Sequence, residues 1–167
     1  MGKTVYYQVG YNPLLWSIGR LTKSIYNVAN HIIREEIFPT EKRVPDVDEL
    51  ENKILQTSMR DGYKSLPRDT GRLVLEILIK KWQKYKRSLE EWEKYHLSEK
   101  PEPPFYRKRS GVYLIPFKGG QLKQSGGFLE FPLLGSFPIP QADSMKIRSA
   151  AFIPSWSGFR LRIDYEA

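Results

Sequence analysis

The chain has 167 residues, of which 40% are hydrophobic and 13% aromatic. This length and composition are enough to bury a core in one domain or two small ones, which excludes disorder along the whole chain. Lys and Arg number 27 against 19 Asp and Glu, and the net charge of +8 favours a polyanionic partner. The lack of cysteine excludes disulfides, thiolate nucleophiles and cysteine-based zinc sites.

The N-terminal part of the chain predicts one strand followed by a long helix. Residues 4–9 are β-branched and aromatic, which favours a short strand. Asn12-Pro13 then supplies an N-cap and a first-turn proline. Apolar residues between Leu14 and Ile32 recur at steps of four and three. We therefore predict an amphipathic helix that ends near Phe38-Pro39.

Two more helices are predicted in the middle of the chain. A short one follows Asp46, a plausible cap residue, and a stronger one opens at about 65–67 and runs through Trp92. Residues 60–110 carry 14 basic and 8 acidic side chains, a surplus of six out of the total of eight. Cations on the strong helix have few acidic neighbours within a turn, and we favour anion binding over a merely solvated face.

The C-terminal part of the chain predicts several short strands. Short apolar runs are separated by Gly, Pro and Ser, in residues 112–117, 126–134, 145–153 and 159–167. The last run alternates, with apolar side chains from Phe159 to Tyr165 on one face and charged ones from Arg160 to Glu166 on the other. The glycine pairs 119–120 and 126–127 offer backbone amides to a phosphate, but hairpin turns are favoured at both.

This order of elements predicts an α+β fold with two lobes. The first strand is expected to join the last strands in a small barrel, so that residues 1–10 and 104–167 form one domain. Residues 11–103 form a helical domain of about three helices inserted between them. No apolar stretch approaches the roughly 20 residues of a membrane span, and no signal-peptide pattern opens the chain. We expect a soluble cytoplasmic protein.

No catalytic or metal-binding pattern stands out. His31 and His96 are too few for a metal cluster, and a packing or surface role is favoured for His31. No nucleophile elbow, phosphate-binding loop or dinucleotide fingerprint is present. Asp164 alternates with charged neighbours, which favours a solvated strand face over a metal ligand. We expect no enzyme activity from this chain.

Four segments, taken in order, resemble one known family. They are LTKSIYNVANHIIREEIF, YKSLPRDTGRLVLEILIKKWQKY, KPEPPFYRKRSGVYLIPFKGGQLK and GGFLEFPLLG. The first segment contains the pair Tyr26-Asn27. In this order they resemble the N-terminal half of TnpB, the transposon-encoded RNA-guided nuclease related to compact type V CRISPR effectors. The resemblance covers essentially the whole chain, and the order is more specific than any one segment.

The resemblance implies a wedge domain, which is an oligonucleotide-binding-like β-barrel, with an inserted helical recognition domain. These lobes would bind a guide RNA from the transposon end, hold the guide–target heteroduplex and read a short motif in the adjacent target DNA. In the family a RuvC-like nuclease domain with Mg²⁺-binding acidic residues follows. This sequence stops at Ala167, where that domain would begin, so we expect the chain to cleave no nucleic acid and to need no cofactor. In the full-length protein, the nuclease domain would be a further partner.

The residue types and the resemblance together give a set of nucleic-acid-binding candidates. Arg68 and Arg72 resemble family positions that contact the adjacent motif, although the family commonly has Gln where Arg72 stands. Arginine pairs with guanine edges and lysine holds phosphate. The prolines at 101, 103 and 104 keep the following aromatic and cationic residues extended, and we expect those residues to touch RNA. The full set is Lys64, Arg68, Arg72, Lys80, Lys81, Lys84, Arg87, Tyr106, Arg107, Lys108, Arg109, Lys118, Gln121 and Lys123.

Two alternative functions remain open at the level of sequence. One is a nuclease-less derivative that acts alone as an RNA-guided repressor or regulator of the transposon, bound to the nucleoid DNA. The other is a general basic module for protein interaction or RNA binding, whose charge mainly aids solubility.

Overall fold

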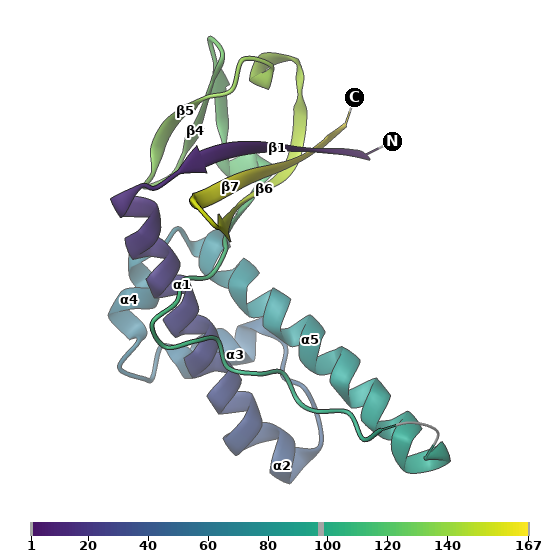
Figure 1. Ribbon diagram of the computed structural model, residues 1–167. Helices are drawn as coiled ribbons and strands as arrows, with labels where there is room; N and C mark the ends of the chain where they lie inside the picture. The colour runs from purple at the N-terminus through teal and green to yellow at the C-terminus, as the bar shows by residue number, and fades with distance from the viewer. Residues whose placement is uncertain (1, 97–98, 167) are drawn as a thin grey trace.

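The computed structural model describes residues 2–96 and 99–166, which fold into a helical lobe and a sheet lobe (Figure 1). The helices are α1 (Pro13–His31), α2 (Phe38–Glu41), α3 (Val47–Ile54), α4 (Arg60–Ser65) and α5 (Arg68–Tyr95). The strands are β1 (Gly2–Gly10), β2 (Ile115–Lys118), β3 (Lys123–Ser125), β4 (Phe128–Phe131), β5 (Gly135–Pro138), β6 (Lys146–Ser155) and β7 (Gly158–Glu166). The α+β class is confirmed.

The predicted helix caps are confirmed. The Asn12 side chain accepts hydrogen bonds from the amides of Leu14 and Leu15 at the start of α1, at 2.9 and 3.2 Å. Asp46 accepts one from the Glu49 amide at 2.8 Å at the start of α3. Each cap satisfies amides that a helix N-terminus leaves without an intrahelical partner, so both start points are fixed locally.

A π-helical stretch, Ile32–Ile37, joins α1 to α2 and carries the helix beyond Pro39. Here the Phe38 amide bonds to the Ile33 carbonyl, five residues back. Pro39 lacks an amide hydrogen, and in a regular α-helix its ring would clash with the Glu35 carbonyl. The wider turn accommodates the proline, and the helix continues to Glu41.

The strands form two antiparallel sheets, with orders β1-β7-β6-β2 and β3-β4-β5. β1 pairs with β7 from Gly2 opposite Glu166 onward, so the predicted joining of the first strand to the last ones is confirmed. Across the described residues neither sheet closes into a barrel. The predicted alternation in β7 is also present, with Phe159, Leu161 and Ile163 buried and Arg160 and Arg162 exposed.

The two glycine pairs have different roles. Gly126 and Gly127, with φ of 57° and 79°, form the two-residue turn between β3 and β4, so the hairpin prediction is confirmed there. This left-handed conformation suits glycine, which lacks a Cβ. Gly119 and Gly120 instead lie in a 3-10 turn, Gly119–Gln121, and the hairpin prediction is wrong at this pair.

Each lobe has its own hydrophobic core. The helical core is centred on Ile25, Leu78 and Trp82, and the core of the sheet lobe on Phe117 and Phe152. Two buried residues cross between the lobes: Leu15 of α1 packs in the sheet core, and Tyr113, just before β2, packs in the helical core. The lobes are thereby fixed to each other. No helix in the described ranges is long and apolar enough to cross a membrane.

Candidate nucleic-acid interface

The chain returns from α5 to β2 through an irregular segment, residues 99–114, which we call the return segment. It runs back from the far end of α5 across α1 to the sheet lobe (Figure 1). Its course is fixed by the α1 side chains Lys23, Asn27 and Asn30, which share one helix face at steps of four and three. All three bond to backbone groups of the return segment.

Asn27 and Lys23 hold the basic part of the return segment. The Asn27 amide nitrogen donates to the Arg107 carbonyl at 3.0 Å, while its oxygen accepts from the Arg107 amide at 2.8 Å. The buried Lys23 ammonium donates to the Arg109 carbonyl at 2.5 Å. Because these bonds use backbone groups, they leave the side chain of Arg107 free to point elsewhere.

Asn30 joins the proline-rich part of the return segment to α5. It is fully buried, donates to the Pro104 carbonyl at 3.0 Å and accepts from the Trp82 indole nitrogen at 2.8 Å. A buried amide with partners on both sides is well satisfied. Asn30 therefore fixes α1, α5 and the return segment together.

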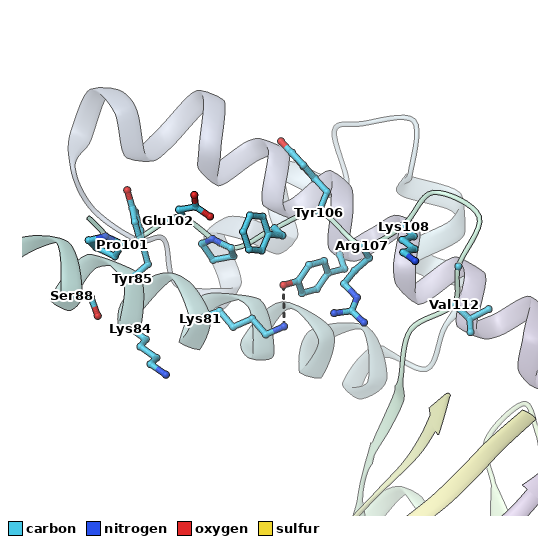
Figure 2. A pocket seen from close by; sticks show the side chains of 14 residues that line it. Lys81, Lys84, Tyr85, Ser88, Pro101, Glu102, Tyr106, Arg107, Lys108 and Val112 are labelled. Carbon is cyan, nitrogen blue, oxygen red and sulfur yellow. Dashed lines mark hydrogen bonds between the residues drawn. The ribbon is translucent and has the colours of Figure 1, made fainter. Parts of the chain in front are cut away.

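A groove with a cavity volume of about 700 Å³ lies between α5 and the return segment. Figure 2 shows the side chains that line it, and these include five of the candidate residues predicted from sequence, namely Lys81, Lys84, Tyr106, Arg107 and Lys108. Residues brought from positions far apart in sequence thus share one hollow. The groove is rich in both cationic and aromatic side chains.

Tyr26 lines the groove and packs on Tyr113 behind it, and this pair of tyrosines is flanked by two cations. The rings of Tyr26 and Tyr113 lie 4.9 Å apart between centroids. The Lys81 ammonium lies 5.0 Å from the Tyr26 centroid and donates to its hydroxyl at 3.2 Å. The Arg107 guanidinium lies 4.7 Å from the Tyr113 centroid. Figure 2 shows the charged ends of Lys81 and Arg107 converging, and cation–π attraction offsets part of their repulsion.

The surroundings shift the pKa values of the groove residues. Partial loss of hydration, followed by repulsion from Arg107, lowers the pKa of Lys81. Burial, followed by the neighbouring Tyr113, raises the pKa of Tyr26 to about 12, so its hydroxyl stays protonated. The Tyr26 shift reflects burial, whereas the Arg107 contribution to the Lys81 shift reflects close positive charge, which a bound anion would relieve.

The cations of the groove lack carboxylate partners. Lys81, Lys84, Arg107 and Lys108 form no salt bridge with any described residue. Glu102 is the one acidic residue among the described residues that line the groove, and it too forms no salt bridge there. The lining therefore carries four cations against one carboxylate.

Two aromatic residues of the return segment add flat surface beside these charges. Phe105 is 71% exposed and Tyr106 is 41% exposed, although both are large apolar rings. The Arg34 guanidinium lies 5.0 Å from the Tyr106 centroid, and the Tyr106 hydroxyl lies 3.5 Å from Nδ1 of His31. Exposed rings beside cations are suited to stacking on nucleobases.

A second set of candidates gathers at the start of α5. Lys118 lies 3.8 Å from the Asp69 carboxylate, and the Gln121 amide donates to the Thr70 hydroxyl at 3.4 Å. This brings the turn after β2 next to the helix that carries Arg68 and Arg72. The structure therefore places Arg68, Arg72, Lys118 and Gln121 in one region.

The two arginines of this set already have acidic partners. Arg72 pairs with Asp48 at 2.8 Å and with Glu51 at 2.9 Å, and its side chain is 19% exposed. Arg68 contacts Glu51 at 3.3 Å, but its side chain is 76% exposed. Arg72 is thus engaged within the helical lobe, whereas Arg68 remains accessible.

Five candidates lie outside both sets. Arg87 borders a neighbouring depression that also includes Lys84, and Lys123 borders one that includes Gln121. Lys64 is exposed in the last turn of α4 and Lys80 is exposed on α5. Arg109 contributes its carbonyl to Lys23. The structure does not bring these five together.

The sequence analysis missed several residues that build the groove. Tyr113 and the polar residues Lys23 and Asn30 were not candidates, and Tyr26 and Asn27 entered only as part of the resemblance. A signal was present for three of them, because polar residues at 23, 27 and 30 recur at helical spacing on the side of α1 away from its apolar stripe. Tyr113 gave no signal, since its place depends on the path of the return segment.

Asp164 and the histidines make ordinary contacts. Asp164 accepts hydrogen bonds from Thr4 at 2.6 Å, Ser149 at 3.0 Å and Arg162 at 3.3 Å. Partial burial acts to raise its pKa, but these bonds and the Arg162 charge outweigh that effect and lower it. His96 ends α5 in a left-handed conformation. Within residues 2–96 and 99–166, no three His, Asp or Glu side chains gather as a metal site would require.

Comparison with known proteins gives no assignment, because no protein-family model and no curated protein matches the chain.

Proposed function

We propose that this chain is the guide-RNA and target-DNA binding portion of a TnpB-like RNA-guided endonuclease, acting in the cytoplasm on chromosomal DNA. The observation that carries the proposal is the groove, where unpaired cations and exposed rings come from α5 and the return segment. Cations neutralise phosphates and rings stack on bases, so the groove offers the two interactions that single-stranded nucleic acid requires. The sequence resemblance supplies the identity of the ligand.

The arrangement of the chain supports the same proposal. β1 pairs with β7, and every helix from α1 to α5 lies between them in sequence. This is the order expected for a helical recognition domain inserted into a wedge domain. In this proposal the seven strands form the wedge lobe. Its likeness to an oligonucleotide-binding fold is inferred from the sequence resemblance, because the two sheets do not close into a barrel in the described residues.

The second set of candidates has a place in this proposal. Arg68, Lys118 and Gln121 lie where the two lobes meet at the start of α5. A short DNA duplex bound there would contact both lobes at once. Arg68 is the accessible arginine for a guanine edge, and Lys118 is 51% exposed for a phosphate.

The experiment that tests the proposal removes the two cations that flank the tyrosine pair. The double variant Lys81→Ala/Arg107→Ala is expected to bind a structured RNA about tenfold more weakly, with a shallower dependence of affinity on salt. Its thermal stability should be equal to or above that of the unmodified chain, because two converging like charges are removed. Fluorescence anisotropy at several salt concentrations measures the affinity.

The matched control is Lys53→Ala/Lys146→Ala, which changes the net charge equally at residues outside the groove. It is expected to retain most of the affinity. Equal losses in the two double variants would mean that only the overall charge attracts RNA, and the groove would not be the binding site.

A further inference from the structure

The turn between β6 and β7 carries a tryptophan that contacts solvent on all sides. Trp156 and Ser157 are the two turn residues between Ser155 and Gly158. Trp156 is fully exposed, and none of the other exposed large hydrophobic residues of the described chain exceeds 71%. A turn needs no indole, and water solvates one poorly, so this fully exposed ring is available for a binding contact.

The hairpin tip that presents Trp156 is held in place by two contacts with β1. The Gln8 amide nitrogen of β1 donates to the Ser155 hydroxyl at 3.3 Å and to the Ser157 hydroxyl at 2.8 Å. Gly158, with φ of 135°, packs so closely on Gly10 that a Cβ would collide with the Gly10 carbonyl. The tip is therefore ordered before any ligand binds, which lowers the entropic cost of binding.

Beside this tip, the outer face of the sheet alternates aromatic and cationic side chains. Tyr6 is 49% exposed, and the Arg160 guanidinium lies 4.8 Å from its ring centroid. Arg162 lies opposite Tyr6 in the β1–β7 register and contacts Asp164. Arg160 forms no salt bridge with any residue that the structure describes. This is the charged face of β7 that the alternation predicted.

We infer that the surface formed by Trp156, Tyr6, Arg160 and Arg162 binds single-stranded nucleic acid. Bases would stack on the indole and phenol rings, and phosphates would pair with the two arginines. A duplex hides the faces of its bases, so an unpaired strand fits this surface better. The surface shares no residue with the groove, and it does not depend on the function proposed for the groove.

The test compares Trp156→Ala with Trp156→Phe in binding to oligouridine, oligothymidine and a blunt DNA duplex of equal length. For Trp156→Ala, affinity for the single strands should fall about tenfold, the typical worth of one stacked base. Trp156→Phe should retain most of the affinity because it keeps a ring. Tighter binding of oligouridine would identify the strand as RNA, and tighter binding of oligothymidine as DNA. Arg160→Ala should make the dependence of affinity on salt concentration shallower, by the amount expected for the loss of about one phosphate contact.

Phe128→Ala is the matched control, since Phe128 is a half-exposed aromatic residue on the other sheet. It should leave single-strand binding unchanged. The inference is overturned if Trp156→Ala also leaves it unchanged, or if Trp156→Ala instead converts a dimer into a monomer in sedimentation. The groove variant Lys81→Ala/Arg107→Ala, measured in parallel, separates the two proposals, because each surface can fail while the other binds.

Discussion

At the scale of single residues, Glu51 connects three helices. Its side chain is only 9% exposed and accepts hydrogen bonds from the Tyr63 hydroxyl at 2.6 Å, from Arg72 at 2.9 Å and from Arg68 at 3.3 Å. A buried carboxylate is costly unless its oxygens are satisfied. Here α3, α4 and α5 each contribute to the network. Glu51 thus sets the position of Arg72, one of the predicted DNA-binding residues.

We predict that Glu51→Gln lowers the free energy of unfolding by about 3 kcal/mol at neutral pH. Burial acts to raise the pKa of Glu51, but hydrogen bonds from Tyr63 and Arg68 and the charge of Arg72 outweigh it and lower the pKa. The stabilisation is therefore full above the ordinary glutamate pKa and is lost as pH falls through the lowered folded value.

Urea unfolding at a series of pH values from neutral to acidic measures this prediction. The gap in stability between the unmodified chain and Glu51→Gln should narrow as the pH falls. A gap that stays constant across the series would show that the ionised carboxylate does not stabilise the fold.

At the scale of elements, the return segment depends on the polar face of α1. Asn27→Ala removes two hydrogen bonds at an exposed position and should lower the free energy of unfolding by about 1 kcal/mol, with faster hydrogen exchange at the Arg107 amide.

Asn30→Ala leaves the buried Trp82 indole nitrogen without its partner and should lower the free energy of unfolding by about 2 to 3 kcal/mol. Native-state hydrogen exchange and urea unfolding measure the two effects.

Ser24→Ala is the control for both variants, because Ser24 bonds only within α1, to the Arg20 carbonyl. Ser24→Ala should change neither the free energy of unfolding nor hydrogen exchange at the Arg107 amide. If Asn27→Ala left hydrogen exchange at the Arg107 amide unaltered, the hydrogen bonds from α1 side chains would not be what holds the return segment in place.

Elements with strong periodicity were predictable from sequence, and those set by tertiary contacts were not. α1, α5 and β7 each combine a clear repeat with a cap or a turn, so their positions follow from local chemistry. α4 and β3 have six and three residues, too few to show a repeat. The π-helical stretch before Pro39 extends a helix that the proline was expected to end.

The candidate site was predictable only in part, for a similar reason. Charge and residue type identified Lys81, Lys84 and Arg107, which are cations in the basic middle of the chain. The convergence of Lys81 and Arg107 on Tyr26 and Tyr113 depends on how the return segment crosses α1, which no local pattern encodes. Sequence likewise could not show that Arg72 is engaged by carboxylates from another helix.

At the scale of the whole molecule, positive charge is concentrated in the part of the chain that runs from α4 through α5 to the return segment. Six of the eight excess charges lie in residues 60–110, which include α5 and the basic part of the return segment. The groove lies on the helical lobe, and the surface around Trp156 lies on the sheet lobe. A long RNA with both structured and unpaired regions would contact both surfaces, and its affinity would fall steeply with salt.

The most direct test of this account is to express the chain together with the noncoding DNA that flanks its gene, crosslink the complex, and sequence the RNA that copurifies. We predict a single enriched RNA transcribed from the flanking DNA, with crosslinks at exposed groove residues such as Phe105 and Tyr106. The Lys81→Ala/Arg107→Ala variant should lose that enrichment. Recovery of only abundant cellular RNAs in proportion to their amounts, or of no RNA, would contradict the proposed function.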